Sequence, residues 1–543
     1  MKRFFYTLFL AIGLLAQWAL PAQGAREYFT VNEVRYKYVD STSVLFSGLT
    51  KEWTSSFICN VPSNVIYQGK VYRVVGIQSN AFYVDRRSPT KYNGYYLEKI
   101  TIPASVKTIG DQAFYGCRQL TTVDLGNGVK SIGNQAFSGC ASLQSITIPS
   151  SVEKIGVMAF EGCKSLTNIQ VGSGNTHYRS IDGILFNAAG DTLVDYPRGL
   201  VATHEPDLIP QGTRAIGKGA FASTDTLHRI TIPASVACID SSAFQGCWRL
   251  TDIAGAFNPE VIGDQAFFGC SSLRAMTVNS KVRHIGTAAF SNCCRMTQFT
   301  VDPANRSYIT IDSALFTPDT ATIVAYPMGR GIVLDSILWG ASYYSLAYKL
   351  PEGTKIIPPY TFYYEGLKDS TGNIFDFSYE VFDFSYEDIV LTLPASIVSI
   401  GDMAFYRYYH ATFSGTSITS LSTTPCPLPE NAMMRDIKQL DAYNMTWRFL
   451  YANLLVPKGC VDTYKETLYW NYFDNIAEIP SDPEPEPLKG DLNGDGVTNV
   501  TDVAYLVGMI IGNSDLVTAG DINGDSTIDT SDVTSLVNYI LKK

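Results

Sequence analysis

The stretch ITIPASVKTIGDQAFYGCRQLTTV (Ile100–Val123) decides the fold, because much of the chain repeats it. The segment ITIPSSVEKIGVMAFEGCKSLTNI (Ile146–Ile169) aligns with it without a gap. The shared unit is L-x-x-I-x-I-P-x-S-V-x-x-I-G-x-x-A-F-x-G-C, and its final cysteine recurs at a constant interval at Cys117, Cys140 and Cys163. Self-similarity at a fixed period of this length indicates a repeat architecture.

The core I-G-x-x-A-F of this unit occurs in ten copies, some of them degenerate. Leu120, Val123 and Leu125 alternate with polar residues as one face of a short strand would, and NQAF (134–137) predicts a single helical turn. One unit is too short to enclose a core alone, so we predict stacked copies that form a solenoid with a parallel sheet on one side. The Ile/Phe pairs are Ile77/Phe82, Ile109/Phe114, Ile132/Phe137, Ile155/Phe160, Ile216/Phe221, Ile239/Phe244, Ile262/Phe267, Ile285/Phe290, Ile357/Phe362 and Ile400/Phe405.

Two longer units interrupt the period. YRSIDGILFNAAGDTLVDYPRG (Tyr178–Gly199) matches YITIDSALFTPDTATIVAYPMG (Tyr308–Gly329) without a gap, so Tyr178 corresponds to Tyr308. Each places a polar turn between two apolar runs, which predicts a β-hairpin insertion. The array is therefore duplicated, roughly over 97–200 and 227–330.

These repeats resemble the BspA-like leucine-rich repeats of bacterial surface proteins, over roughly residues 65–480. The closing segment LLVPKGCVDTYKETLYWNYFDNIAEI (Leu454–Ile479) is similar to the usual end of such arrays. The resemblance implies a leucine-rich-repeat solenoid of short parallel β-strands with single helical turns over residues 77–480, after an N-terminal β cap region at 25–76. It also implies adhesion to host, matrix or cell-surface ligands.

The periodic cysteines could bind something, bridge something, or only pack. Each lies three residues after the repeat phenylalanine and should point inward with it. Parallel side chains on adjacent repeats disfavour disulfide geometry. We therefore expect buried, reduced thiols that act as small apolar fillers. The six members of this ladder are Cys117, Cys140, Cys163, Cys247, Cys270 and Cys293.

The C-terminal end is chemically distinct. Residues 481–543 hold 11 Asp and Glu against 3 Lys, which accounts for about −8 of the net charge of −10. A Pro/Glu linker at 481–490 leads to DLNGDGVTNVTD (Asp491–Asp502) and then, further along, to DINGDSTIDTSD (Asp521–Asp532). Oxygen donors at loop positions 1, 3, 5, 7, 9 and 12 suit Ca²⁺. A solvated acidic linker is the alternative, but each loop also precedes an apolar stripe at helical spacing, such as Val503, Leu506, Val507 and Ile510.

Residues 491–543 resemble a type I dockerin, a small all-α module with two EF-hand-like loops that binds two Ca²⁺ ions and docks to a cohesin-type domain. Three departures leave the partner and the strength of the second loop open: Ser526 replaces a turn glycine, Thr498 replaces an apolar residue, and the usual basic pair early in the helix is absent. The resemblance places partner contacts at Val500, Thr501, Thr530 and Ser531. It places the metal ligands at Asp491, Asn493, Asp495, Val497, Asn499 and Asp502, and at Asp521, Asn523, Asp525, Thr527, Asp529 and Asp532.

The N-terminus has a basic start, an apolar stretch and a small-residue cleavage site, which predicts a secretory signal peptide at 1–24. A membrane anchor is the alternative, but the apolar run is short and Pro21 ends it. We expect a secreted or cell-surface bacterial protein without a membrane span in the mature chain. The negative net charge argues against nucleic-acid binding.

Threonines occupy one register of the predicted strands. They could form a hydroxyl ladder that binds a partner, or they could reflect the β-propensity of exposed strand positions. We consider both interpretations open. The residues are Thr101, Thr147, Thr231, Thr277 and Thr300.

No catalytic motif stands out, and the strong patterns are those of binding modules. The leading hypothesis is an exported, non-catalytic adhesion or scaffold protein, held to a cohesin-type partner by its C-terminal domain. The alternatives are a carbohydrate-active or carbohydrate-binding component of a polysaccharide-degrading complex, and a solenoid that serves only as a spacer.

Overall fold

The structure is a computed structural model that describes residues 27–50, 55–84, 93–201, 209–255, 257–330, 332–338, 341–363, 386–405, 417–429, 449–480, 492, 498–511, 522–523 and 527–542. The chain forms two compact units, Met1–Ala477 and Glu478–Lys543. The expected signal peptide at 1–24 and linker at 481–490 lie outside the described residues.

Among the described residues, six strands precede the regular repeats. Strands β1 and β2 pair antiparallel, as do β2 and β3, while β3 pairs in parallel with β6. Phe29, Tyr36 and Phe46 on these strands are buried, so the sheet covers the N-terminal end of the repeat core. The bounds are β1 (Tyr28–Val31), β2 (Val34–Tyr38), β3 (Ser43–Leu49), β4 (Phe57–Asn60), β5 (Asn64–Tyr67) and β6 (Lys70–Ile77).

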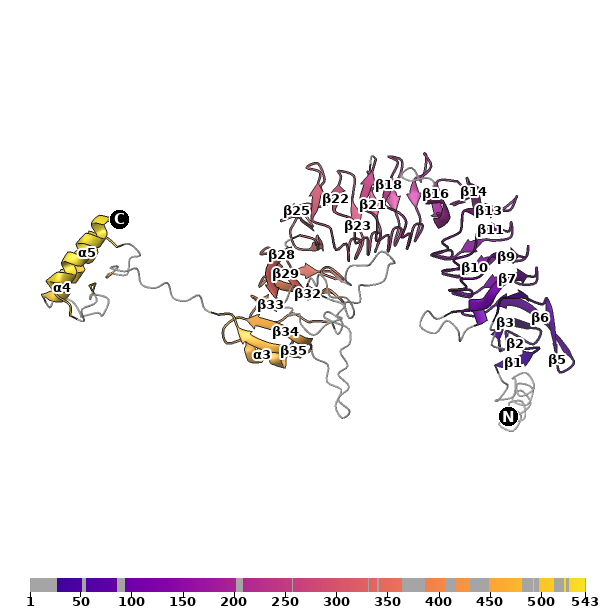
Figure 1. Cartoon of the computed structure of the whole chain (residues 1–543), viewed down its shortest axis with the longest axis horizontal. Coiled ribbons are helices and arrows are strands. Elements are labelled where there is room, and N and C mark those ends of the chain that lie inside the picture. Colours follow the sequence, from indigo (N-terminus) through magenta and orange to yellow (C-terminus); the bar gives the residue numbers. More distant parts are fainter. Residues whose placement is uncertain are drawn as a thin grey trace, which may run out of the picture. The chain divides into compact units, whose positions relative to one another are not determined.

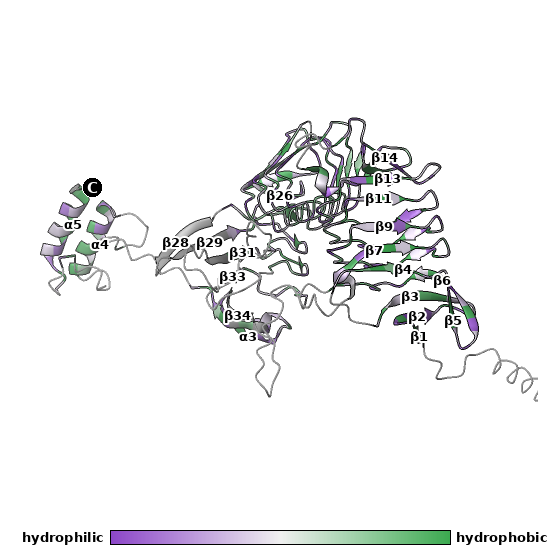
Figure 2. Cartoon of the chain, turned by 45° about the vertical axis from the view of Figure 1, so that its right-hand side comes forward, coloured by the Kyte–Doolittle hydropathy of each residue, from purple (hydrophilic) through white to green (hydrophobic). Residues whose placement is uncertain are grey.

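The first array stacks its strands in two parallel ladders (Figures 1 and 2). Ile132 pairs with Ile109 on one side and with Ile155 on the other, so equivalent residues of successive copies are neighbours. The first ladder contains β4, β7 (Leu97–Ile102), β9 (Thr122–Leu125), β11 (Ser145–Ile148) and β13 (Asn168–Val171), after a 3₁₀ turn η2 (Asn93–Tyr96). Strands β4, β7 and β9 form one hydrogen-bonded sheet and β11 and β13 a second one stacked next to it. The second ladder contains β6, β8 (Thr108–Ile109), β10 (Ser131–Ile132) and β12 (Lys154–Ile155).

The A-F-x-G-C segments form a third ladder, which the sequence did not predict. The Phe114 N–H donates to the Ala136 carbonyl at 2.8 Å, and the Gly116 N–H donates to the Ser138 carbonyl at 2.8 Å. These segments are turns rather than the expected single helical turns, because the residue two positions before each repeat phenylalanine has a positive φ that ends any helical run. In the ten copies this residue is Asn80, Gln112, Gln135, Met158, Gly219, Ser242, Gln265, Ala288, Tyr360 or Met403. The solenoid of short parallel strands itself is confirmed.

Phenylalanines and cysteines fill the interior at regular spacing. The rings of Phe82, Phe114, Phe137 and Phe160 stack with centroid separations of 5.2, 5.0 and 5.8 Å. In all six ladder copies the cysteine Sγ donates to the carbonyl of the phenylalanine in the preceding copy, at 3.0–3.4 Å. All eleven cysteines are free thiols, and the ladder members are buried. The packing interpretation of the cysteines is therefore confirmed.

Each insertion is a three-stranded antiparallel unit that leads into the next part of the array. Strand β16 pairs in parallel with β17, which carries the second ladder into the second array. The first insertion contains β14 (Tyr178–Ile181), β15 (Ile184–Asn187) and β16 (Thr192–Asp195), followed by η3 (Arg198–Leu200). The second contains β25 (Ile309–Ile311), β26 (Ala314–Phe316) and β27 (Ile323–Ala325).

The second array repeats the plan of the first. Its first-ladder strands are β18 (Arg229–Thr231), β20 (Asp252–Ala254), β22 (Ala275–Val278) and β24 (Gln298–Val301). Its second-ladder strands are β17 (Ala215–Ile216), β19 (Cys238–Ile239), β21 (Val261–Ile262) and β23 (His284–Ile285).

The degenerate copies build a less regular end with its own buried cluster. Trp470 is buried there, and its Nε1 donates to the Cys426 carbonyl at 2.7 Å. The elements are β28 (Ile332–Leu338), β29 (Ala341–Lys349), β30 (Ile356–Ile357), β31 (Tyr386–Leu393), β32 (Ser399–Ile400), β33 (Ser417–Ser420), β34 (Phe449–Val456), α3 (Val461–Glu466), η4 (Trp470–Tyr472) and β35 (Phe473–Glu478).

Candidate functional site

The C-terminal unit is built from two helices, α4 (Val500–Ile510) and α5 (Thr530–Lys542). They pack through a small cluster of buried side chains that includes Leu506 of α4 and Leu536 of α5. Each helix begins at the last third of one of the acidic loops, so the packing of the pair brings the ends of both loops into one domain.

One carboxylate of each loop is fully buried. Asp502 accepts hydrogen bonds from the Leu492 N–H at 2.7 Å and the Asn499 N–H at 2.8 Å. Asp532 accepts from the Ile522 N–H at 2.8 Å and the Asp529 N–H at 2.9 Å. Both aspartates stand at loop position 12 and are 0 % exposed. The two loops therefore share one local design around an interior negative charge.

The residues at loop position 9 begin the helices. Asn499 is the N-cap of α4, and its Oδ1 accepts from the Thr501 N–H at 2.7 Å, while Asp502 completes a capping box. In the second loop the Asp529 Oδ1 accepts from the Ser531 N–H at 2.7 Å in the same way. These contacts hold the described loop residues at the start of each helix.

The donor set fits a hard cation. Burying a carboxylate is costly unless charge or hydrogen bonds compensate it, and carboxylate, amide and carbonyl oxygens are the ligands that Ca²⁺ prefers. Six of the expected ligands are described, and within the described parts of the chain no three His, Cys, Asp or Glu come together as a metal site. The described ligands are Asn499, Asp502, Asn523, Thr527, Asp529 and Asp532. Those outside the described residues are Asp491, Asn493, Asp495, Val497, Asp521 and Asp525, and Ser526 lies there too.

The four expected partner residues lie at the exposed starts of the two helices. Val500 is 73 % exposed, and Thr530 is exposed as well. The hydroxyls beside them make contacts within the domain: Thr501 Oγ1 donates to Asn499 Oδ1 at 2.8 Å, and Ser531 Oγ accepts from Asn523 Nδ2 at 2.7 Å. The apolar and methyl-bearing neighbours are therefore the more available part of each pair.

Helix α4 exposes an apolar stripe that sequence reasoning missed. Val507 was expected among the inward residues, but it is 39 % exposed, and Ile511 just past the helix is 64 % exposed. With Val500 and the exposed Ala504 they follow the spacing i, i+4, i+7 and i+11, which places them on one helix face. The sequence shows this spacing, but it shows the equally regular apolar residues Val503, Leu506 and Ile510 as well. Spacing alone does not tell which of the two sets faces the domain interior.

The expected threonine ladder on the solenoid is interrupted. Thr277 and Thr300 are direct neighbours, and their Oγ1 atoms lie 3.0 Å apart. Elsewhere the register inserts other residues: Asp124 pairs with Thr101, Gln170 with Thr147, and Ala254 with Thr231. The threonines therefore share one register, but other residues hold this position in the intervening copies, so adjacent threonines occur only at Thr277 and Thr300 among these five.

The geometry thus defines a class: a solenoid of short repeats joined to a two-helix domain with two acidic loops. Comparisons with family models sharpen this. The BspA type leucine rich repeat region matches residues 88–189 and 208–320 in six copies, and the dockerin type I domain matches residues 489–541. The chain therefore combines a BspA-type leucine-rich-repeat region with a C-terminal type I dockerin domain, as the resemblances implied.

Several solved structures are similar to parts of the chain. A leucine rich cell surface protein from Faecalibacterium prausnitzii is 19% identical over 85% of this chain and 97% of its own, with a TM-score of 0.32. A leucine-rich repeat protein from Bacteroides ovatus is 19% identical over 72% and 94%, with a TM-score of 0.29. No curated protein matches the chain. The fold assignment rests on the repeat matches and the strand ladders.

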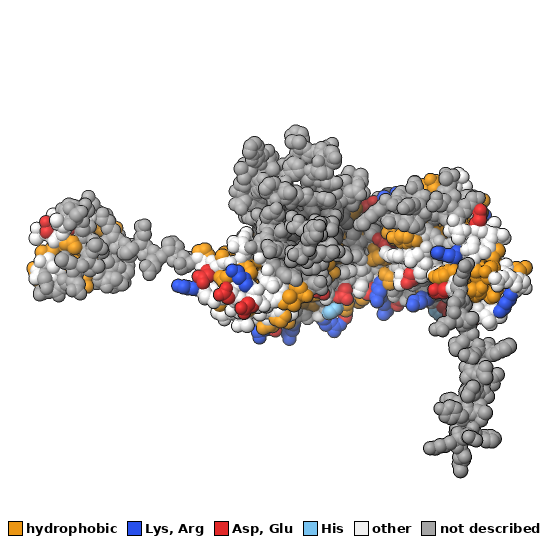
Figure 3. Space-filling model, turned by 90° about the horizontal axis from the view of Figure 1, so that it is seen from below, with side chains coloured by type: hydrophobic (Ala, Val, Ile, Leu, Met, Phe, Trp, Pro, Cys, Tyr) orange, Lys and Arg blue, Asp and Glu red, His pale blue; other side chains and the backbone are white. Residues whose placement is uncertain are grey.

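No helix in the described residues combines the length and apolar character needed to cross a membrane. Charged side chains of both signs are interspersed on the face drawn in Figure 3.

Proposed function

We propose that this chain is an exported, non-catalytic adhesion or scaffold protein. The repeat solenoid presents a ligand-binding surface, and the dockerin attaches the chain to a cohesin-type partner. The matched modules are of interaction type, and the repeats and the dockerin together favour protein–protein interaction in a cohesin-anchored assembly. Export is consistent with the N-terminal sequence, and the place of action is the extracellular space or the cell surface.

The observation that carries this proposal is the pair of fully buried loop carboxylates, Asp502 and Asp532. Two Ca²⁺ ions, one in each loop, would compensate these charges and fix the loops against the helix starts. Loop ordering would then orient the exposed faces of α4 and α5 for docking. Calcium acts here as a structural ion, and the chain's own helices make the partner contacts.

The two helices offer unequal docking faces. Val500, Ala504, Val507 and Ile511 form an apolar stripe along α4, whereas on α5 Thr530 and Thr534 replace the first two and only Val537 and the exposed Leu541 are apolar. Exposed apolar side chains in a row are characteristic of protein interfaces. The α4 stripe is therefore the preferred contact with the cohesin-type partner.

Calcium-dependent capture tests this function. The mature chain (25–543) should bind Ca²⁺ at two sites by calorimetry and should be retained by immobilised cohesin domains only without chelator. The double variant Asp502→Asn/Asp532→Asn should lose both properties, because neutral amides remove the charge that the ion compensates. Asp515→Asn, which lies outside both loop motifs, is the matched control and should behave as the parent chain. Capture that survives both chelator and the double variant would overturn the proposal.

A second function has its own support. A polar groove on the first array has the chemistry of a small-molecule or glycan site, which favours a carbohydrate-binding component of a polysaccharide-degrading complex as the alternative. The two functions are compatible, since the groove and the dockerin are separate.

A further inference from the structure

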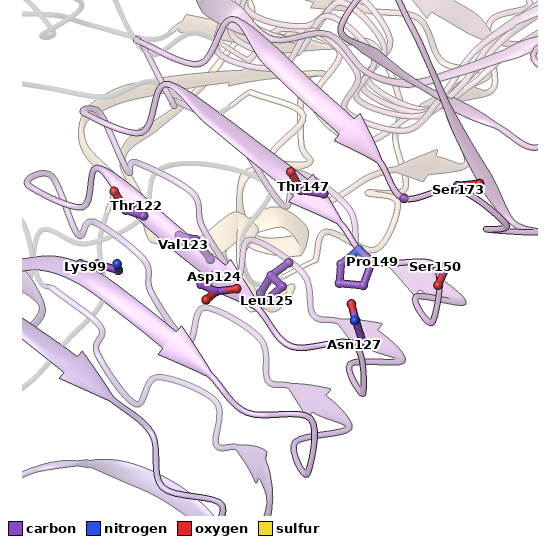
Figure 4. A pocket seen from close by; sticks show the side chains of 11 residues that line it. Lys99, Thr122, Val123, Asp124, Leu125, Asn127, Thr147, Pro149, Ser150 and Ser173 are labelled. Atoms are coloured by element: carbon purple, nitrogen blue, oxygen red, sulfur yellow. The ribbon is translucent and has the colours of Figure 1, made fainter.

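A groove lies on the outward face of the first ladder, across β7, β9 and β11 and the turns that follow β9, β11 and β13 (Figure 4). It has a volume of about 600 Å³, which is within the range of small-ligand sites. Its polar side chains come from the strands of three successive copies and from the turns that follow β9, β11 and β13. They are Lys99, Thr122, Asp124, Asn127, Thr147, Ser150 and Ser173.

Most of these polar groups are left unpartnered by the fold. The side chains of Lys99, Asp124, Asn127, Thr147 and Ser150 make no hydrogen bond or ion pair with any other described residue. Asp124, Asn127, Thr147 and Ser150 are also exposed. A row of free donors and acceptors in a hollow is available to a ligand without loss of an internal contact.

The second array provides an internal comparison, because its residues correspond to those of the first by the same shift that relates Tyr178 to Tyr308. The counterparts of Lys99 and Thr122 are Arg229 and Asp252, which form an ion pair at 3.0 Å.

Two further residues of the second array also form hydrogen bonds within the protein. Thr277, the counterpart of Thr147, shares a hydrogen bond with Thr300 at 3.0 Å. Asn279 stands where the first array has Pro149, and its Nδ2 donates to the Phe257 carbonyl at 2.7 Å. Asp124 is replaced by Ala254. Four polar side chains on this face of the second array, Arg229, Asp252, Thr277 and Asn279, therefore have partners within the protein, whereas most polar side chains of the groove in the first array have none among the described residues.

We propose that this groove binds a neutral oligosaccharide, which deepens the proposed function by naming a ligand of the solenoid and rests on it to that extent. The Lys99 ammonium donates, the Asp124 carboxylate accepts, and the Asn127 amide and the hydroxyls of Thr147 and Ser150 do both. Sugar hydroxyls also donate and accept, so they can satisfy this mixed set. One positive and one negative side chain leave the groove without a net charge preference.

The lining disfavours an extended peptide. Peptides that add to sheets pair with a strand edge, whereas the lining side chains of this groove project from the faces of strands that are stacked side by side, with β7 paired to β9 and β11 paired to β13. Protein contacts are usually anchored by aromatic or arginine side chains in apolar pockets, and the groove lining is mainly polar. A hydroxyl-rich ligand that lies flat across three copies matches the site better.

The test is binding of the mature chain to an immobilised array of neutral plant, animal and microbial oligosaccharides, followed by calorimetry with the best-bound sugar. Asp124→Ala and Thr147→Ala should each weaken binding, Asp124→Ala by about tenfold or more, because a hydrogen bond to a charged group is lost. Thr277→Ala, at the equivalent place in the second array, should leave binding unchanged. Asp124, Thr147 and Thr277 are all exposed, so we expect the variants to fold. Circular dichroism checks this.

Three outcomes would overturn the proposal: no retention on the whole array, retention that the Asp124→Ala/Thr147→Ala double variant does not reduce, or groove-dependent binding to a peptide array instead. The outcome is separable from the dockerin function. Asp502→Asn/Asp532→Asn should keep sugar binding while losing cohesin capture, and Asp124→Ala should do the reverse.

Discussion

The two insertions end in equivalent junctions that differ sharply in chemistry. The first junction contains Glu161, Lys164, Asp195, Arg198 and Asp225. The second junction has Ser291 in place of Glu161, Cys294 in place of Lys164, Ala325 in place of Asp195 and Met328 in place of Arg198. A cluster of charges in one array is thus replaced by small, hydroxyl or apolar side chains in the other.

The charges of the first junction are largely interior. The Arg198 side chain is 8 % exposed and pairs with Asp225, which Lys164 also approaches at 3.3 Å. Glu161 accepts from the Ser223 hydroxyl at 2.5 Å. Burial raises the pKa of Asp195 to about 8, and the nearby Glu161 charge contributes to this rise. The second junction instead buries Ala325 and Met328.

The backbone around both junctions is nevertheless the same. The hydroxyls of Tyr178 and Tyr308 accept from the N–H groups of Ile155 and Ile285, at 2.9 and 2.7 Å. Gly199 donates to the Leu166 carbonyl at 2.7 Å, and a Cβ at this position would lie 2.7 Å from that oxygen. The comparison teaches that backbone contacts and ring packing define the fold, while the charges add a pH-sensitive feature to one array only.

The largest effect should come from the ring stack that the two arrays share. Phe114 and Phe244 are equivalent and fully buried, and each stacks between two other rings. Phe114→Ala and Phe244→Ala should each lower the local free energy of unfolding by about 3–5 kcal/mol, through lost burial and a cavity. Hydrogen exchange resolved along the chain measures both. Tyr115→Ala, the partly exposed neighbour, is the control with a much smaller loss, and a clear inequality between the two Phe variants would contradict a shared core.

The next largest effect should be a difference between the two junctions in how stability depends on pH. Asp195 has a folded-state pKa of about 8 and an unfolded value of about 3.9. Between these values the folded state holds a proton that the unfolded state has lost, so the stability contribution falls as pH rises from about 4 to about 8. Asp195→Asn, which mimics the neutral acid, should flatten this dependence and stabilise the first array at pH 8.

Denaturant unfolding followed by exchange in each array between pH 4 and 8 checks this. The exposed Asp182→Asn is the control and should leave the pH profile unchanged. The second array, where Ala325 replaces Asp195, should show no such dependence. If the Asp195→Asn variant kept the pH dependence of stability seen in the parent chain, the buried acid would not be its cause.

The smallest effect concerns a charge pair of reversed polarity. Lys130 and Glu153 lie 2.7 Å apart in the first array, and Glu260 pairs with Arg283 at the same places in the second. All four side chains are more than 40 % exposed, so solvent screens each pair and its contribution to stability is small. The exchange Lys130→Glu/Glu153→Lys should preserve the melting temperature within error, while Lys130→Glu alone should lower it slightly. A large loss in the exchanged protein would indicate that the pair has a specific role.

Much of the solenoid could be predicted because each repeat has a short, local pattern of residue types. The fixed period, the inward Phe114 and Cys117, and the burial of the thiols all follow from which residues recur together. The helical turn at A-F-x-G-C could not be predicted correctly, because propensity favours it and only hydrogen bonds to the next copy stabilise the positive φ at Gln112. The same period also gives the register between copies, since Asp124 stands one period after Thr101 and pairs with it.

In the C-terminal domain, too, some features could be predicted from the sequence and others could not. Spacing alone pointed to Asp502 and Asp532 as equivalent loop residues, and the structure buries both. The exposure of Val507 could not be read from spacing, since two apolar stripes overlap on α4 and only packing against α5 selects the inward one.

The sequence by itself determined the repeat, its core positions, the duplicated array and the two acidic loops, because each depends on a short pattern of residue types. Only the tertiary structure decided which polar groups find partners. Lys99 has no ion-pair partner among the described residues, whereas its counterpart Arg229 is paired with Asp252. Asp195 is buried near Glu161, a placement that no local pattern of the sequence indicates. These outcomes depend on how separate copies approach one another in space, and that approach determines where a ligand can bind.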